Sequence, residues 1–267
     1  MSCEDLYYEY VDENTQEDPS QSSIREKLEV FFEKNSKEVF FSRQLEVQNE
    51  DTYFHWVTNR AVHDLVESGN VRSETRKLKT GGEIHLLWHQ NYRYYRRKAS
   101  EVVKLVEEYA DPNICIGMHG EAMVLEAFAR FQFIMRGRHI NSYQGKKWAE
   151  TNNNLDFIFE RDGVSYGIEV KNMLGYMDQK EFNIKMQICK YLNIRPVFVV
   201  RMMPRTWINE LVENGGYAMI MKYQLYPWTH KELARKIAKK LNLPVDAPNA
   251  IADGTMQRFL KWQTKNM

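Results

Sequence analysis

Apolar and polar residues follow two different periods along this chain, and the change from one to the other marks its organisation. In the first third, apolar residues recur at helical spacing in segments that begin near Ser23, Ser42 and Tyr53. Two strand-like runs, 71–73 and 84–88, follow on either side of a Gly-Gly turn. The pattern therefore predicts three helices and a hairpin.

Beyond residue 98, helical and strand-like segments alternate. The predicted helices are 98–109, 121–134, 178–193, 205–214 and 230–241, and the predicted strands are 154–160, 164–171, 196–202 and 217–223, with an earlier strand between 138 and 143. Alternation of this kind is typical of the α/β class, in which helices flank a mixed sheet.

Composition agrees with a globular protein. The chain has 267 residues, of which 43% are hydrophobic and 27% charged, and its apolar runs are too short to span a bilayer. We see no charged-then-apolar leader. Cys3, Cys115 and Cys189 are far apart in the sequence, which argues against disulfides or a zinc finger and fits a reducing compartment. We therefore expect a cytoplasmic protein without membrane association.

Charge is distributed unevenly. Residues 1–22 contain seven acidic and no basic side chains, whereas the remainder carries 37 basic and 29 acidic ones. The first segment is expected to be a flexible acidic tail, either solvated or folded back over a basic groove. The predicted division is a tail at 1–22, a first domain at 23–97 and a second domain at 98–267.

The segment from residue 23 to about 90 resembles a winged helix, a DNA-binding variant of the helix-turn-helix. That resemblance implies that the third helix enters the major groove. Its buried face is expected to hold Trp56, Val57, Val62, Leu65 and Val66, and its outer side Thr58, Asn59, Arg60 and His63. Asn59 and Arg60 are candidates for contacts with adenine and guanine.

Basic residues cluster after the third helix, with Tyr92, Tyr94 and Tyr95 interleaved among the last of them. The candidates for phosphate contacts there are Arg72, Arg76, Lys77, Lys79, Arg93, Arg96 and Arg97. Lys146 and Lys147, in a polar loop, are further candidates. The alternatives are a solvated wing and linker, or a surface for another protein.

The most informative stretch is 154–171. Asp162-Gly163 favours a two-residue type I′ turn, which would set Arg161 against Val164 and Asp156 against Glu169. Alternation along the two strands predicts one apolar face made of Leu155, Phe157, Phe159, Tyr166, Ile168 and Val170. The opposite face would gather Asp156, Glu169 and Lys171.

Two carboxylates placed opposite each other in a hairpin repel. A divalent cation offsets that repulsion, and Mg²⁺ is often held by one or two carboxylates with water and phosphate oxygens. Lys171 would face the same side, where it could contact a phosphate or the attacking water. The alternative for Glu169 and Lys171 is a surface ladder of charges.

Asp156 followed by Glu169-Val170-Lys171 resembles the active site of the PD-(D/E)XK nuclease superfamily, although Leu155 stands where the motif has proline. The resemblance implies a restriction-endonuclease-like fold in which Asp156, Glu169 and the Val170 carbonyl bind the metal. It also implies that Glu121 assists and that Lys171 activates water. Gln187 and Tyr191 have the spacing of the Gln-x-x-x-Tyr pair of RecB-like members. The alternatives are non-catalytic. Glu121 could be an acid that favours the N-terminus of a helix, and Gln187 and Tyr191 could form the polar rim of an amphipathic helix.

The two resemblances together imply an endonuclease that hydrolyses DNA, expected to be double-stranded, with Mg²⁺ or Mn²⁺ as its cofactor and a homodimer as its active form. A reader domain beside a nuclease domain favours a restriction or defence role. Repair, recombination or transposition is the alternative within that class. A non-catalytic DNA-binding regulator on a nuclease fold is the alternative from another class.

Overall fold

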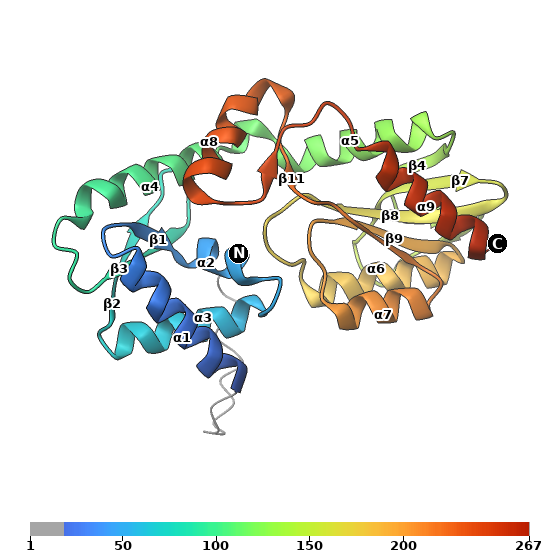
Figure 1. Cartoon of the computed structure of the whole chain (residues 1–267). Coiled ribbons are helices and arrows are strands. Elements are labelled where there is room, and N and C mark those ends of the chain that lie inside the picture. The colour runs from blue at the N-terminus through green and yellow to red at the C-terminus, as the bar shows by residue number, and fades with distance from the viewer. Residues whose placement is uncertain (1–18, 267) are drawn as a thin grey trace. The chain divides into compact units, whose positions relative to one another are not determined.

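The computed structural model describes residues 19–266, which form two compact units (Figure 1). The first unit extends to Pro112 and includes Lys236–Leu243, and the second contains Asn113–Arg235 and the chain from Pro244. The expected acidic tail lies outside the described residues except for positions 19–22. Across the described part of the chain, no helix combines the length and apolar character needed to cross a lipid bilayer.

The first unit contains helices and a three-stranded antiparallel sheet with the order β1-β3-β2. Its elements are α1 (Pro19–Lys34), β1 (Val39–Phe41), α2 (Ser42–Asn49), α3 (His55–Glu67), β2 (Val71–Lys77), β3 (Glu83–His89) and α4 (Tyr95–Tyr109). The predicted hairpin is confirmed, because Val71 pairs with His89 and Lys77 with Glu83. Strand β1 was not predicted, since three apolar residues are too few to show a period.

The core of the first unit gathers apolar residues from α1, α2 and α3. Leu28, Phe32, Leu45 and Leu65 are all at most 1% exposed. Helix α1 begins at Pro19, four residues before the predicted start. Proline suits the first turn of a helix because its missing N–H would have no partner there.

The expected buried face of α3 is partly wrong. Trp56 is 41% exposed and stacks on Phe54 at 4.4 Å, whereas Thr58 is fully buried. The reason is a small rotation of the helix, whose inward positions are 57, 58, 61, 62 and 65. Arg60 and His63 point outward as expected, while Asn59 is only half-exposed.

The second unit is built on a five-stranded mixed sheet with the order β10-β9-β8-β7-β4. Its helices are α5 (Ile116–Arg130), α6 (Gln179–Leu192), α7 (Arg205–Glu213) and α9 (Asp253–Asn266), and α8 (Lys231–Leu241) begins in it. Its main strands are β4 (Ile134–Ile140), β7 (Leu155–Arg161), β8 (Val164–Lys171), β9 (Arg195–Val200) and β10 (Tyr217–Ile220). Short segments complete it: η1 (Pro112–Ile114), β5 (Ser142–Tyr143), β6 (Lys146–Lys147), β11 (Gln224–Leu225), η2 (Trp228–His230) and β12 (Val245–Asp246).

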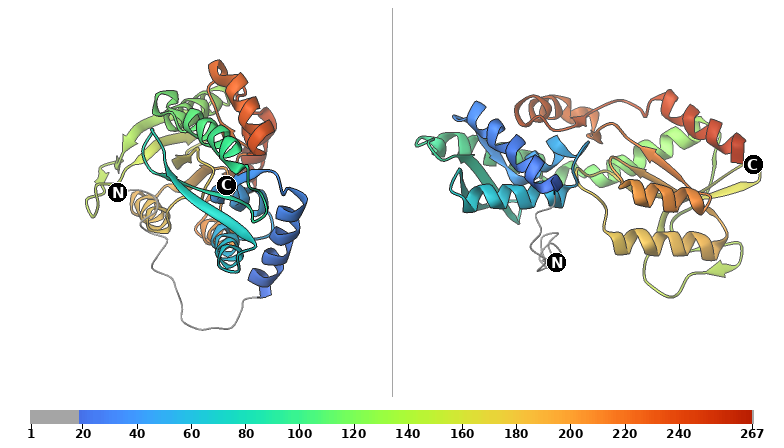
Figure 2. Two further views of the ribbon diagram at one scale, coloured as in Figure 1. Left: turned by 90° about the vertical axis from the view of Figure 1, so that its left-hand side faces the viewer. Right: turned by 60° about the horizontal axis from the view of Figure 1, so that its bottom comes forward.

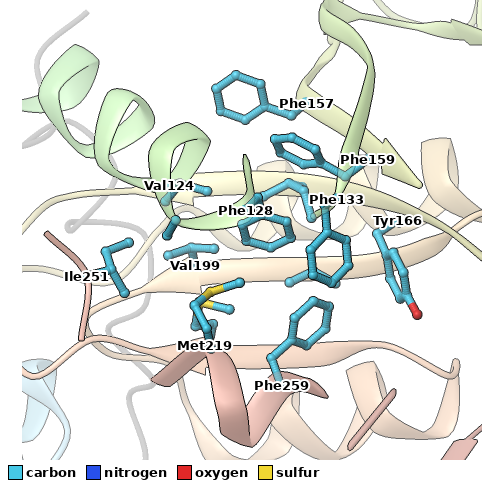
Figure 3. Packing of buried hydrophobic residues seen from close by; sticks show 14 of the residues in the cluster. Val124, Phe128, Phe133, Phe157, Phe159, Tyr166, Val199, Met219, Ile251 and Phe259 are labelled. Carbon is cyan, nitrogen blue, oxygen red and sulfur yellow. The ribbon is translucent and has the colours of Figure 1, made fainter. Parts of the chain in front are cut away.

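Helices cover both faces of this sheet, as the α/β prediction required. Strands β4, β7 and β8 are antiparallel neighbours, and β8, β9 and β10 run parallel. Helices α5 and α9 lie on one side, with α6 and α7 on the other (Figure 1, Figure 2). On the first side, Phe128 and Phe259 pack against Phe159 and Tyr166 of the sheet (Figure 3).

Helix α9 was not predicted from the sequence. Met256 and Phe259 are fully buried in the main core of the unit, with Leu260 and Trp262 packed partly against it. These positions follow an i, i+3, i+4 pattern, so a weak helical signal was present. The C-terminal segment therefore supplies part of the hydrophobic face that the sheet needs.

Candidate active site

The hairpin formed by β7 and β8 has the register predicted from its turn. Asp162 and Gly163 both have positive φ, 53° and 76°, as a type I′ turn requires. Arg161 pairs with Val164, and the regular pairing continues to Phe157 opposite Ile168. The regular pairing stops one position before Asp156 and Glu169, and these two carboxylates are close enough for the charge of Asp156 to act on Glu169.

The predicted apolar face is confirmed except at its end. Phe157, Phe159, Tyr166 and Ile168 share one core cluster, but Leu155 packs with Ile158, Ile188 and Cys189 on the side of α6. The regular β7–β8 pairing runs only to Phe157, and beyond it strand alternation no longer fixes the side of a residue. The opposite face is also covered, because Ile158 is fully buried there.

Glu169 is the most deeply buried acid of the site, at 2% exposure. Its Oε1 lies 3.1 Å from Lys171 Nζ, and its Oε2 lies 2.6 Å from Lys185 Nζ. Burial, followed by the charge of Asp156, raises the pKa of Glu169 to about 7, although both lysines act in the opposite direction. Two ammonium groups therefore do not fully offset the cost of this buried carboxylate.

Asp156 is half-buried at the same end of the hairpin. Its Oδ2 accepts a hydrogen bond from Val170 N–H at 2.7 Å, which fixes the carboxylate against β8. Burial raises the pKa of Asp156 above its usual range, and that hydrogen bond is the main influence in the other direction. The charge of Glu121 raises it further, so three acids influence one another here.

Glu121 comes from the first half of α5, and its ligand atom joins a small cluster at the site. The side-chain ligand atoms of Glu121, His139 and Asp156 all lie within 4.8 Å of one another. Arg138 donates to Glu121 Oε2 at 3.1 Å, and His139 Nε2 is 3.5 Å from the same oxygen. The predicted grouping of Glu121 with Asp156 is therefore present, together with two β4 side chains that were not predicted.

Lys171 bridges two carboxylates, since its Nζ donates to Glu181 Oε1 at 2.7 Å as well as pairing with Glu169. Burial disfavours its charge, but the carboxylates of Glu169 and Glu181 outweigh burial and raise the pKa of Lys171 above its usual range. Lys171 is therefore an ammonium ion at neutral pH. It can donate hydrogen bonds and attract anions, but it is not poised to accept a proton.

The end of β8 is tied to α5 by the next residue, Asn172. Its side-chain amide donates to the carbonyls of Ile116 and Leu225 and accepts from Leu225 N–H, at 2.7–2.8 Å. Gly120 faces this side chain so closely that an added Cβ would stand 2.6 Å from Asn172 Cβ. Helix α5 reaches the sheet at this point because position 120 has no side chain.

Gln187 and Tyr191 are brought to a different surface from the acids. Both are exposed on α6, and Tyr191 packs edge-on against Trp148. The α6 residues that contact the site are Glu181 and Lys185, four residues apart on one helix face. Lys146 Nζ donates to the Tyr191 carbonyl, and Lys146 and Lys147 are both exposed in β6.

Lys185 was not predicted to belong to the site, although the pattern of residues along α6 indicates a buried lysine there. Phe182, Met186 and Cys189 form a buried stripe at helical spacing, and Lys185 interrupts that stripe at 4% exposure. A lysine in the apolar face of a helix needs a buried partner, because an unpaired buried charge is costly. The signal indicates an acid on the facing strand, and Glu169 is that acid.

Apart from Lys146 and Lys147, the basic residues predicted for DNA contact lie in the first unit, and several already have acidic partners. Arg76 pairs with Glu74 at 2.6 Å, Lys79 with Glu107 at 3.8 Å and Arg97 with Glu101 at 3.2 Å. A further group is exposed, namely Arg60, Arg72, Lys77, Arg93 and Arg96.

The start of α4 carries an open hollow of about 800 Å³. Its lining combines tyrosines and arginines with one lysine and one acid, from Tyr92 to Lys98 and at Glu101. Tyr95 stacks on Trp88 at 3.9 Å and is held by it, whereas Tyr94 is 85% exposed. This part of the first unit therefore presents aromatic faces and cations together, the mixture that nucleic-acid surfaces use.

Comparisons with known proteins give little beyond the geometry. The chain matches no protein-family description, and it matches no curated protein. Among solved structures it is similar to protein VC1899 from Vibrio cholerae, with 16% sequence identity and a TM-score of 0.27. That match covers 85% of this chain and 52% of the other, so the chain spans about half of that protein's length.

Proposed function

We propose that this protein is a metal-dependent DNA endonuclease of the PD-(D/E)XK type. The observation that carries the proposal is that Asp156 lies close to both Glu121 and Glu169 at one end of the mixed sheet, with Lys171 beside Glu169. Glu169 is the buried member and Asp156 and Glu121 are half-buried. Buried like charges are costly, so their presence favours a site that takes up a cation.

The order of elements in the second unit supports the same proposal. Helix α5 precedes the antiparallel strands β4, β7 and β8, and α6 and the parallel strand β9 follow. Restriction-endonuclease-like proteins share the order helix, three-stranded meander, helix, strand. The candidate acids then occupy the first helix, the middle strand and the third strand of that arrangement.

The residues fit a hard divalent cation. Asp156 and Glu169 with the Val170 carbonyl would hold the ion and Glu121 would assist, and these oxygen donors suit Mg²⁺ and also Mn²⁺. His139, which lies beside Glu121 and Asp156, would offer a nitrogen donor to the same ion. The raised pKa of Glu169, caused by burial and by Asp156, is the cost that a cation would relieve. When bound, such an ion supplies Lewis-acid stabilisation of the phosphate and lowers the pKa of a water molecule.

The protein's own groups position the reactants. Lys171, a cation at 3.1 Å from Glu169, would donate to a non-bridging oxygen of the scissile phosphate or hold the attacking water. As an ammonium ion it would act as a hydrogen-bond donor, and the proton of the attacking water would pass to solvent or to another phosphate oxygen. Arg138, exposed beside Glu121, stands where it would meet the DNA backbone.

For the first unit we propose a winged-helix reader of duplex DNA. Helix α3 presents Arg60 and part of Asn59 outward, and the β2–β3 hairpin carries Arg76, Lys77 and Lys79 near its tip and Arg72 at its base. Arg93, Arg96 and Arg97, with Lys146 and Lys147 of the second unit, are the remaining candidates for phosphate contacts. A restriction or defence role, with the protein acting as a homodimer, fits a reader joined to a nuclease.

A non-catalytic DNA-binding regulator is the second candidate. The observation that favours it is that both oxygens of Glu169 already contact ammonium groups and that Glu121 contacts Arg138. In that case the acids would be structural partners of these cations, and a divalent ion would have no measurable effect.

Plasmid cleavage separates the two candidates. Purified protein is incubated with supercoiled and linear duplex DNA in Mg²⁺, in Mn²⁺ and in EDTA, beside the variant Glu169→Gln. We expect nicked or linear products with either metal and none with EDTA or with the variant. Equal DNA binding with no cleavage under any metal condition would favour the regulator, and cleavage that survives EDTA would overturn the proposed site.

A further inference from the structure

Lys185 and Lys171 hold the two oxygens of Glu169 in different ways. Lys185 is 4% exposed, and its Nζ contacts Glu169 Oε2 and also donates to the Asn154 carbonyl. Its neighbours on α6 are buried apolar residues, so the ammonium is held inside the unit. Lys185 is thus a fixed charge beside one oxygen of the carboxylate.

Lys171 is a movable charge beside the other oxygen. Its side chain keeps 26% exposure, and its Nζ is closer to Glu181 Oε1, at 2.7 Å, than to Glu169 Oε1, at 3.1 Å. Glu181 is itself 29% exposed at the start of α6. The ammonium can therefore leave Oε1 and keep a carboxylate partner.

We propose that Lys185 is a positioning residue that lowers the affinity of the site for its divalent cation and leaves only Oε1 of Glu169 available to it. Glu181 receives Lys171 when the ion takes Oε1. This inference rests on the proposed metal site. It adds a control of ion loading by Lys185 and Glu181 to that site.

The physical argument is a balance of two effects. Without Lys185, Glu169 would be a buried carboxylate with one partner, and the fold would be less stable in the absence of metal. With Lys185, a divalent ion on Oε1 is repelled by an ammonium that cannot withdraw. Weak ion binding by the protein alone means that the oxygens of an arriving phosphate complete the coordination, which links ion loading to substrate binding.

The test measures Mn²⁺ affinity of the full-length protein by electron paramagnetic resonance, together with thermal unfolding in EDTA. For Lys185→Met and Lys185→Gln we expect Mn²⁺ binding at least about tenfold tighter, because a repelling charge a few ångströms away is removed. We also expect a lower Tm in EDTA and a larger increase of Tm on adding Mn²⁺. Lys190→Met, an exposed position on the same helix, is the matched control and should behave as the wild type.

A purely structural lysine gives a different result. It predicts a lower Tm with Mn²⁺ affinity unchanged or weaker, and that outcome for either Lys185 variant overturns the inference while leaving the proposed function intact. Absence of Mn²⁺ binding by the wild type would overturn both the proposed metal-dependent function and the inference about Lys185.

Glu181→Gln gives a readout that does not depend on how α6 tolerates a change at position 185. Lys171 then loses its second partner and stays on Glu169, so we expect Mn²⁺ binding about tenfold weaker. Unchanged affinity in Glu181→Gln would contradict the assignment of Glu181 as the receiving carboxylate and overturn the inference.

Discussion

Each unit of this protein buries a carboxylate among cations, and the two arrangements differ in one respect. In the first unit Glu46 is 5% exposed and pairs with Arg43, three residues earlier on the same helix, at 2.8 Å. Burial raises the pKa of Glu46, and attraction to Arg43 and His55 opposes it. At Glu169 two lysines oppose burial in the same way, but the charge of Asp156 adds to the effect of burial. Glu46 is thus balanced by Arg43 and lies near His55, whereas Glu169 has a second carboxylate beside it, whose repulsion the proposed metal ion would offset.

The largest difference between the two carboxylates should appear in cleavage. Asp156→Asn or Glu169→Gln should lower the rate of DNA cleavage on the order of 10³-fold or more with binding retained, because each removes a ligand of the metal. Glu46→Gln should leave the rate within a factor of about two, since Glu46 only stabilises the first unit. Rates from plasmid assays with saturating protein test this, and an equal loss in all three variants would erase the distinction.

A second prediction concerns what the first unit contributes. Reversing the charge of Arg96 and Arg97 should weaken duplex binding at least about tenfold for all sequences and flatten its dependence on salt. The metal site should be untouched, so Mn²⁺ affinity should match the wild type. Fluorescence anisotropy over a salt series gives the slope. An unchanged slope would assign these arginines to contacts within the protein, such as that of Arg97 with Glu101.

A third prediction concerns target choice. Arg60 points outward from α3 whereas Asn59 is half-buried, so Arg60→Ala should relax selectivity more than Asn59→Ala. A good bidentate contact with a base contributes roughly 1–3 kcal/mol of discrimination. Sequencing the ends of cleaved DNA measures this. Identical cut-site profiles for the wild type and both variants would show that α3 does not contact the bases that determine target choice.

The smallest expected effect is on stability against pH. Glu169 has a folded-state pKa of about 7, above its ordinary value of 4.5, so the native state binds its proton more tightly than the unfolded state does. Its contribution to stability is therefore full below about pH 4.5 and is lost as pH rises through about 7. In EDTA we expect Tm to fall by several degrees between pH 5 and 8.

Two variants sharpen this pH prediction. Asp156→Asn should flatten the profile, because the charge of Asp156 is one cause of the raised pKa of Glu169. It should also raise Tm at pH 8 by removing repulsion. Glu169→Gln should remove this pH dependence, because the carboxyl group that titrates is gone. Parallel profiles for wild type and Asp156→Asn would show that the two acids do not interact.

Much of the hairpin site could be predicted because its information is local. Asp162-Gly163 fixes the turn, the turn fixes the register, and the register brings Asp156 and Glu169 together. The division into helices and strands follows from periodicity for the same reason. Glu121 was found only through its resemblance to a motif, since the approach of α5 to the strands is a property of packing.

The other predictions about side chains depended on which face of a helix packs against the core. The spacing of Gln187 and Tyr191 shows that they share a side of α6 but not which side, and the buried stripe around Phe182 and Cys189 turns Lys185 inward instead. Trp56 was misplaced in the same way, by a small rotation of α3. His139 could not be predicted from strand alternation. Its backbone has a φ of 47°, just beyond an irregular stretch of β4, so the direction of its side chain does not follow from the alternation.

Gly120 lies so close to Asn172 that a single added carbon atom, the Cβ of an alanine at position 120, should change the distance of Glu121 from Asp156 and Glu169. A methyl group at position 120 would have to occupy space 2.6 Å from Asn172 Cβ, so α5, which carries Glu121, and the end of β8 would have to move apart. The third acid would then stand farther from Asp156 while the hairpin pair kept its place. The size of the side chain at position 120 should therefore set the distance between Glu121 and Asp156. Substitution by Ala, Ser and Val is expected to increase that distance step by step.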